Sequence, residues 1–396
     1  MKKTIVLVFS FFVLLFCVSC KETPKKPVSP SATPSPEITS TPTPSPTEAP
    51  TADMLDIPST ELVKLLGAGF NIGNSLDASG SKLSAETAWG NPKTTKELVK
   101  ALKDAGFNTI RVPVSWANHF GIFPDFTIDA EWLARVKEVV DYAIDLDLYV
   151  ILDMHHEQSA WLKVTEKDYP GVRVKFMALW KQIALTFKDY DEHLIFEACN
   201  EPRTIGSAAE WNGGTREERE VINKLHADFY NTVRETGGNN SIRHLMFQTY
   251  GGSTNTNALA QWINPNPEDK HIIASVHAYT PYDFALNIKG GNHFNSSETA
   301  SKRDIDYLKT ILKQYFIDKG IPVILGECGS VNKNNLEDRV DHISYFFKTL
   351  NSIGVPCVWW DNGCVTGDGE LFGIIDRNTY EWIFPELRDA MINAIK

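Results

Sequence analysis

The feature that most constrains the fold is a regular alternation of short apolar stretches with amphipathic ones along residues 55–396. The short stretches are rich in β-branched and aromatic residues, which predicts strands. The eight predicted strands are 69–75, 107–112, 149–154, 194–199, 244–249, 272–277, 323–327 and 357–360. Between them apolar residues recur with helical spacing, as in 94–105 and in 129–145, where Asp129 is the expected N-cap.

Strands that alternate with helices are predicted to pair in parallel, because each connection is long enough for a helical crossover. The other predicted helices are 172–188, 216–235, 250–262, 301–318, 335–351 and 384–395, of which 250–262 has the weakest pattern. Short apolar strands are typical of a sheet that is buried on both faces. We therefore predict an α/β fold, a (β/α)₈ TIM barrel. The alternative, a doubly wound sheet, would bring a Gly-rich nucleotide loop after the first strand, and this sequence has none there.

The N-terminus has the pattern of a secretory signal. Lys2 and Lys3 precede an apolar run that is too short to span a membrane and that ends at Val18-Ser19-Cys20. A Cys directly after a small residue resembles a bacterial lipobox, although Cys17 stands where such sequences usually have Leu. We predict a lipoprotein-type signal peptide at 1–20, with Cys20 lipidated. The alternative, a plain signal peptide that is cleaved nearby, also exports the protein, so we expect a membrane-anchored lipoprotein at the cell surface or a secreted protein.

Residues 21–54 are rich in Pro, Ser and Thr. Proline fixes φ and donates no ladder hydrogen bond, so this segment is predicted to be an extended linker. The predicted catalytic domain is 55–396. Four cysteines remain there, too few for a disulfide scaffold, and buried thiols are the default expectation. A Cys357–Cys364 disulfide remains an alternative.

The net charge of −11 argues against nucleic acid as a partner, because such proteins need a basic face to displace counterions from phosphates. The aromatic content of 11% and the hydrophobic content of 42% exclude a disordered chain.

Polar residues gather after nearly every predicted strand, at the end of a barrel where active sites form. Two glutamates follow apolar strands directly: Glu201 after the fourth and Glu327 on the seventh. Burying a carboxylate there is costly unless it has partners. Paired carboxylates across a barrel mouth suit acetal hydrolysis, in which one protonates the leaving oxygen and the other attacks the anomeric carbon or activates water.

Several sequence passages together resemble glycoside hydrolase family 5, and in particular the endoglucanases of its subfamily 4, over essentially all of residues 55–396. The passages are Gly69-Phe70-Asn71-Ile72-Gly73-Asn74, Thr87-Ala88-Trp89-Gly90-Asn91-Pro92, Arg111-Val112-Pro113-Val114-Ser115-Trp116, Asp153-Met154-His155-His156-Glu157, Phe196-Glu197-Ala198-Cys199-Asn200-Glu201-Pro202, His277-Ala278-Tyr279, Leu325-Gly326-Glu327 and Trp359-Trp360-Asp361-Asn362-Gly363. The resemblance implies a retaining endo-β-1,4-glucanase that needs no cofactor.

The resemblance also implies a role for each matching residue. Glu201 would be the general acid/base and Glu327 the nucleophile, with Arg111 keeping the nucleophile ionised. The other implied substrate-site residues would bind the sugar or orient its neighbours. They are His155, His156, Asn200, His277, Tyr279 and Trp360.

Spacing adds one condition to these roles. Asn200 and Glu201 are adjacent, so strict alternation along a strand would place them on opposite faces and a bulge or strong twist is expected there. Four further tryptophans lie in predicted rim loops, where each either stacks on a sugar or packs beneath the loop. They are Trp89, Trp116, Trp161 and Trp211.

Three other functions fit parts of the sequence: a metal site, a barrel metallohydrolase and a non-catalytic glycan-binding protein. The His155-His156-Glu157 run suggests a metal, but adjacent strand residues point opposite ways, so we expect none. A barrel metallohydrolase would need His-x-His on the first strand, which 69–75 lacks. A non-catalytic glycan-binding lipoprotein would explain the anchor and the aromatics, but not the two glutamates.

The preferred polysaccharide stays open among cellulose, mixed-linkage β-glucan, xyloglucan and mannan, because loops rather than catalytic residues decide it. The expected partners are a β-glucan and, through Cys20, a membrane. We expect a monomer, although no sequence feature fixes the oligomeric state.

Overall fold

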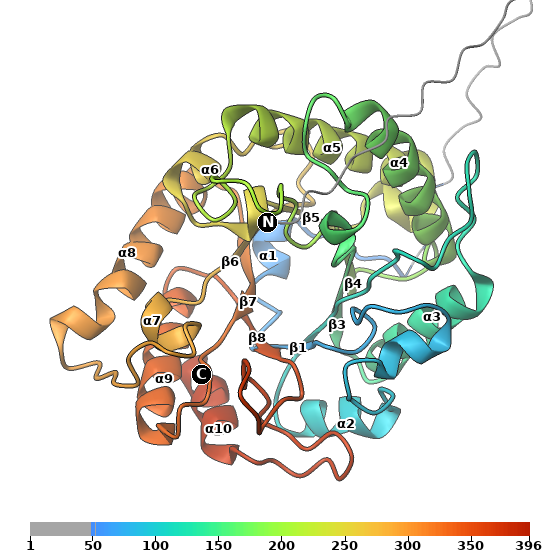
Figure 1. The fold of residues 1–396 in the computed structure, drawn as a ribbon. Helices are drawn as coiled ribbons and strands as arrows, with labels where there is room; N and C mark the ends of the chain where they lie inside the picture. Colours follow the sequence, from blue (N-terminus) through green and yellow to red (C-terminus); the bar gives the residue numbers. More distant parts are fainter. Residues whose placement is uncertain (1–48, 52) are drawn as a thin grey trace, which may run out of the picture. The chain divides into compact units, whose positions relative to one another are not determined.

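Eight parallel strands form a closed barrel in the computed structural model, which describes residues 49–51 and 53–396 (Figure 1). They are β1 (Gly69–Ile72), β2 (Thr109–Val112), β3 (Tyr149–Asp153), β4 (Leu194–Glu197), β5 (Leu245–Gln248), β6 (Ile272–His277), β7 (Val323–Cys328) and β8 (Cys357–Asp361). Strand order follows the chain, and β1 closes the barrel by pairing with β8. The predicted (β/α)₈ barrel is confirmed. The predicted signal peptide, Cys20 and most of the predicted linker lie outside the described residues.

The eight predicted helices are present in the described residues and lie around the barrel, together with two short helices that were not predicted (Figure 1). In chain order they are α1 (Ser59–Leu62), α2 (Lys96–Asp104), α3 (Ala130–Ile144), α4 (Tyr169–Thr186), α5 (Arg216–Glu235), α6 (Thr256–Ala260), α7 (Tyr282–Ala285), α8 (Thr299–Tyr315), α9 (Leu336–Asn351) and α10 (Pro385–Ala394), of which α1 and α7 are the two that were not predicted. Asp129 caps α3 as predicted, because its side chain accepts the backbone N–H groups of Glu131 and Trp132. No helix in the described part of the chain is both long enough and apolar enough to cross a membrane.

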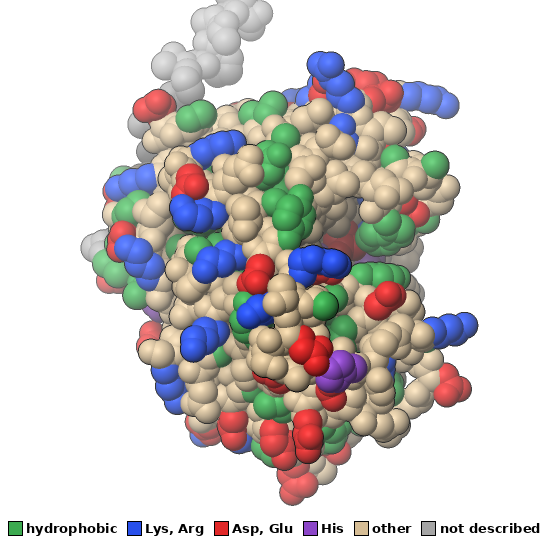
Figure 2. Space-filling view, turned by 90° about the vertical axis from the view of Figure 1, so that its left-hand side faces the viewer, with side chains coloured by type: hydrophobic (Ala, Val, Ile, Leu, Met, Phe, Trp, Pro, Cys, Tyr) green, Lys and Arg blue, Asp and Glu red, His purple; other side chains and the backbone are tan. Residues whose placement is uncertain are grey.

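The side chains of each strand alternate between the helices and the barrel interior. In β3, Val150 and Leu152 belong to the core between sheet and helices, whereas Ile151 belongs to a second cluster inside the barrel. On the outside of the molecule, basic and acidic side chains are interspersed and hydrophobic ones are scattered, as expected for helices that face water (Figure 2).

The second cluster fills the barrel near the N-terminal ends of the strands, and we call it the basal cluster. It consists of Leu62, Val63, Leu66, Tyr149, Ile151, Ile195, Met246, Ile273, Ile324 and Val358. The first three come from α1 and the residues just after it, so this short helix closes that end of the barrel. The interior is therefore a packed core, as in other barrels of this size.

The strand ladder is irregular beside the predicted catalytic residues. Register shifts occur between Val276 and His277 in the β6–β7 pair and between Leu325 and Cys328 in the β7–β8 pair. The expectation of a bulge at Asn200 and Glu201 is wrong. Strand β4 ends at Glu197, so these two residues lie in the following loop and alternation does not apply to them.

All four cysteines of the described residues are free thiols, of which Cys364 is half-buried and the others are buried. Cys357 begins β8, whereas Cys364 follows its other end. The structure forms no disulfide between them. The default expectation of unpaired thiols holds.

Candidate active site

The two predicted catalytic glutamates meet at the C-terminal end of the barrel. Glu201 comes from the loop after β4, and Glu327 from β7. One carboxylate oxygen of each lies within 4.8 Å of the other, and a nitrogen of His277 lies within the same distance of both. Glu327 is buried and Glu201 is half-buried, so the pair lies at the bottom of the mouth rather than at its edge.

Both oxygens of Glu327 accept hydrogen bonds. Arg111 Nη1 donates to Oε1 at 3.0 Å and the Tyr279 hydroxyl donates to Oε2 at 2.9 Å. Burial and the charge of Glu327 raise the pKa of Tyr279 well above its usual value, so Tyr279 remains a donor at neutral pH. These two bonds fix the orientation of the carboxylate.

Glu201 is paired with two cations or potential cations. His277 Nδ1 lies 2.9 Å from Glu201 Oε1, and Arg203 Nη1 lies 3.1 Å from Oε2. Burial alone would raise the pKa of Glu201, but the hydrogen bond and charge of His277, together with the charge of Arg203, lower it to about 2. Burial likewise opposes protonation of His277, yet Glu327 and Glu201 raise its pKa. Both shifts favour an ion pair in which Glu201 is the carboxylate and His277 is protonated.

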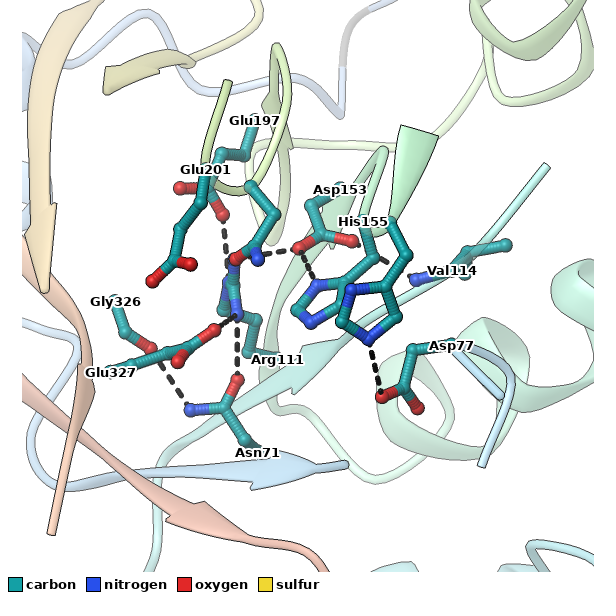
Figure 3. A network of polar contacts seen from close by, with 12 residues as sticks. Asn71, Asp77, Arg111, Val114, Asp153, His155, Glu197, Glu201, Gly326 and Glu327 are labelled. Carbon is teal, nitrogen blue, oxygen red and sulfur yellow. Dashed lines mark hydrogen bonds and ion pairs between the residues drawn. The ribbon is translucent and has the colours of Figure 1, made fainter. Parts of the chain in front are cut away.

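Arg111 connects the strands beneath the two glutamates. Its fully buried guanidinium contacts Asp153 Oδ2 at 2.6 Å, Glu197 Oε2 at 2.7 Å and Glu327 Oε1 at 3.0 Å. Figure 3 shows these groups converging on it from several strands. Although burial opposes the charged form, these carboxylates raise the pKa of Arg111, so it remains a cation. We call the inward-facing groups at this level the polar layer; they are Asn71, Arg111, Asp153, Glu197, Ser275 and Glu327.

Amide and hydroxyl groups complete this network. Arg111 Nη2 donates to Asn200 Oδ1 at 2.8 Å, and Arg111 Nη1 donates to Asn71 Oδ1 at 3.0 Å. Ser275 Oγ donates to Glu197 Oε1 at 2.7 Å. Burial raises the pKa of Glu197 even though Arg111 opposes this effect. The network holds Asn200 beside Arg111 at the level of the glutamates.

The two predicted histidines lie in the loop after β3. His155 Nδ1 lies 2.8 Å from Asp153 Oδ2, and the His155 ring is parallel to the ring of Trp360 at a centroid distance of 5.6 Å. His156 is near Asp77 and Trp89. The expectation that adjacent residues point opposite ways is wrong here, because β3 ends at Asp153 and the two imidazoles are 4.3 Å apart.

The rim tryptophans divide between packing and exposure. Trp116 is completely buried and its indole donates to the Asp153 carbonyl, so it packs beneath the loops. Trp161 is half-buried, whereas Trp89 and Trp211 are 40% and 65% exposed. Only the exposed rings have a face available for a ligand.

Close packing also fixes Trp360. A Cβ added at Gly73 would lie 2.7 Å from the Trp360 indole, so only glycine leaves room for the ring. At Gly252, where φ is +63°, a Cβ would lie 2.9 Å from His277 Cγ. Both glycines let backbone approach a side chain of the site.

The family model "Cellulase (glycosyl hydrolase family 5)" matches residues 73–364, which include every predicted site residue of the barrel. The chain belongs to glycosyl hydrolase family 5. A family 5 relative named Endoglucanase A, from Ruminococcus albus, is 46% identical over 347 residues, or 87% of this chain and 94% of the relative.

Solved structures agree with this assignment. A GH5-4 broad specificity endoglucanase from Ruminococcus champanellensis with bound cellotriose is 42% identical and superposes with a TM-score of 0.83, over 86% of this chain and all of that one. A GH5 xyloglucan-specific endo-β-1,4-glucanase from a metagenomic library, in complex with cellotriose, is 45% identical with a TM-score of 0.81. That similarity covers 84% of this chain and 98% of the other.

Four charged residues of this family 5 site were not predicted from the sequence; one is Arg203, in the loop after β4 beside Glu201. Asp153 and Glu197 end β3 and β4 and point inward to Arg111, and Asp77 lies in the loop after β1 beside His156. A signal was present for Asp153 and Glu197, because each is a carboxylate at an inward position of an otherwise apolar strand. Asp77 and Arg203 had no such signal, since loop positions follow no period.

Proposed function

We propose that this protein is a retaining endo-β-1,4-glucanase in which Glu327 is the nucleophile and Glu201 is the general acid/base. The separation of the two carboxylates is the observation that supports it most directly. Retaining enzymes need carboxyl groups about 5–5.5 Å apart and inverting enzymes about 6.5–9.5 Å. Oxygens within 4.8 Å of each other fit the retaining distance, because no room remains for a water between sugar and base.

The contacts of each glutamate suit a different step. Tyr279 and Arg111 hold Glu327 so that one oxygen attacks the anomeric carbon while the bond to the leaving oxygen breaks. Glu201 gives its proton to that oxygen, supplied from His277 along their 2.9 Å hydrogen bond. In the second step Glu201 takes a proton from water, whose oxygen displaces Glu327 from the anomeric carbon.

Trp360, Asn200, His155 and His156 are proposed to bind the sugar at the cleavage point. Trp360 is only 8% exposed, so the sugar would meet the open part of its indole, and the Asn200 amide lies at the level of the glutamates, where it would meet a 2-hydroxyl. Unsubstituted β-1,4-glucan is the proposed substrate. Xyloglucan and mixed-linkage β-glucan are the alternatives, and the similar xyloglucan-specific enzyme keeps the first of them open.

Substrate preference is tested separately from catalysis, by measuring new reducing ends on soluble cellulose derivatives, mixed-linkage β-glucan, xyloglucan and mannan. The highest kcat/KM on a cellulose derivative is expected. A protein that binds these glycans but releases no reducing ends would instead be a surface glycan-binding lipoprotein.

We also propose that residues 1–20 are a lipoprotein-type signal, 21–54 a linker and 55–396 the catalytic domain, so that the enzyme works outside the cytoplasm. Cells that express the full chain should incorporate labelled fatty acid into it. Cys20→Ala should abolish the label, and a label that survives this substitution would refute the lipid anchor.

Azide rescue tests the two catalytic roles. Glu327→Ala leaves a space at the nucleophile position, so azide should attack directly and give a glycosyl azide of inverted, α configuration. Glu201→Ala still forms the intermediate from substrates with good leaving groups, and azide should then give the β-azide. The exposed Glu268→Ala is the matched control, with unchanged activity. Swapped product configurations would exchange the two roles.

A further inference from the structure

Three clusters in the described part of the chain bring together side chains that are able to hold a metal ion. They are Asp77–His155–His156, Asp191–Glu192–His193 and Glu201–His277–Glu327, each with ligand atoms within 4.8 Å of one another. The proposed hydrolysis of a glycan by Glu201 and Glu327 uses no metal at any of them. They differ in how many hydrogen bonds and ion pairs their ligand atoms already make.

The geometry assigns Asp77, His155 and His156 as a binding site for a zinc-class divalent cation, which would compete with the glycan for this side of the active site. The proposal starts from His155. Its Nδ1 bonds Asp153 Oδ2 at 2.8 Å, which leaves Nε2 as the available ligand atom. A ligating imidazole whose other nitrogen donates to a carboxylate is the usual arrangement around zinc.

The other two side chains have spacing that suits zinc better than a hydrogen bond. His156 Nε2 lies 3.7 Å from Asp77 Oδ2, which is too long for a hydrogen bond. Two ligands of a tetrahedral zinc, with bonds of about 2.0–2.2 Å, are about 3.4 Å apart. A small movement of His156, whose side chain is 31% exposed, would therefore complete this edge of the site.

The carboxylate of this cluster is held in place. Asp77 is fully buried, and its two oxygens accept the backbone N–H groups of Ser75 at 2.7 Å and Asn74 at 3.0 Å. One rigid carboxylate and two imidazoles give a three-ligand site with a fourth position open to water, and imidazole nitrogen selects zinc or copper over magnesium or calcium.

The charge around the cluster also favours a cation. Four buried carboxylates lie in this part of the barrel, three of them on Arg111 and the fourth on Asp77. Asp77 differs from the other three because, among the described residues, no arginine or lysine forms an ion pair with it, so its charge is available to a cation.

The two other clusters are less suited. In the catalytic cluster, Arg111 and Arg203 already contact Glu327 and Glu201, and these cations would repel a metal. The third cluster has one imidazole instead of two, and Nδ1 of that residue, His193, already contacts Asp191 Oδ1 at 3.1 Å, so it offers fewer nitrogen ligands. Both clusters serve as internal comparisons for the experiment.

Calorimetric titration of the purified protein with ZnCl₂ tests the site directly. We expect one zinc ion per chain, affinity at least tenfold weaker in His156→Gln and Asp77→Asn, and no binding of MgCl₂. His193→Gln is the matched control and should bind zinc like the wild type. If Asp77→Asn fails to fold, the partly exposed His156→Gln still decides the question. Equal affinity in wild type and His156→Gln, no zinc binding at millimolar concentration, or a loss confined to Glu201→Gln would each overturn the assignment.

Inhibition kinetics tests the competition, and this second part rests on the proposed function. Zinc should raise KM for a soluble β-glucan without changing kcat, because His155 and His156 are proposed to bind the sugar. Inhibition that lowers kcat alone would overturn competition. If no glycan is hydrolysed, the proposed function fails while calorimetry still decides on the metal site.

Discussion

The two ends of the barrel interior are built from the same strands but from opposite chemistry. In β3, Ile151 belongs to the basal cluster and Asp153, two positions later, belongs to the polar layer. In β4 the same step separates Ile195 from Glu197. Because inward positions recur every second residue, a single step along β3 and β4 changes the interior from apolar to charged.

This difference separates stability from function. Full burial of an aliphatic side chain contributes roughly 1.5–3 kcal/mol, so the basal cluster stabilises the fold. Burying charges costs free energy that their mutual attraction repays only when every charge is paired. The polar layer therefore adds little net stability, but it sets the positions of Glu327 and Asn200 through Arg111.

Arg111→Met should have the largest effect, because it leaves three buried carboxylates of the polar layer without their cation. We expect the free energy of unfolding to fall by about 3–5 kcal/mol and kcat to fall by about 10²–10³-fold or more. Urea denaturation and initial rates measure the two effects. The exposed Arg216→Met is the control and should change neither. Retained stability would mean that the carboxylates do not need Arg111.

Ile273→Ala tests the basal cluster with an effect on stability alone. Removing a buried aliphatic group leaves a cavity, so the free energy of unfolding should fall by about 2–5 kcal/mol. Because Ile273 belongs to the basal cluster and not to the polar layer, kcat per folded molecule should stay within about twofold. A large fall in kcat in the folded variant would contradict the division between the two ends of the barrel.

The difference between the two ends also decides what the sequence could predict. All eight strands were predicted within a few residues, because apolar runs and helical spacing are local properties. Glu201 and Glu327 were found because each sits behind an apolar strand. Asn200, His155 and His156 were correctly placed just after their strands, but the directions of their side chains were not predicted, because strand alternation stops where β4 and β3 end. Pairing of Arg111 with Asp153 and Glu197 was not predicted either, because it is a contact between strands far apart in sequence.

His277→Asn tests whether His277, at the polar end of the barrel, supplies the proton that Glu201 transfers. Burial opposes protonation of His277, but Glu327 and Glu201 raise its pKa above 6.5. In the wild type, kcat/KM should therefore fall with rising pH only above pH 6.5, where the pair loses its proton. Without His277, Glu201 must hold the proton itself. Burial raises the pKa of that carboxyl and Arg203 lowers it, and because a carboxyl starts from about 4.3 instead of about 6.5, the alkaline limb should move to lower pH.

A pH series of initial rates from pH 4 to pH 9 measures that limb. Tyr279→Phe is the matched control, because it removes a hydrogen bond to Glu327 but leaves the Glu201–His277 pair in place. It should lower kcat and keep the limb where it is. An unchanged limb in His277→Asn would mean that another group supplies the proton.

Cys364→Ser should have the smallest effect. It concerns the same comparison, because Cys357 begins β8 at one end of the barrel and Cys364 follows β8 at the other end. Both cysteines are free thiols in the structure, so no disulfide joins the two ends of the strand. The free energy of unfolding should therefore change by less than about 0.5 kcal/mol in Cys364→Ser, and a reducing agent should leave the melting temperature of the wild type unchanged. If reduction lowered the melting temperature of the wild type but not that of Cys364→Ser, Cys364 would form a disulfide that this structure does not contain.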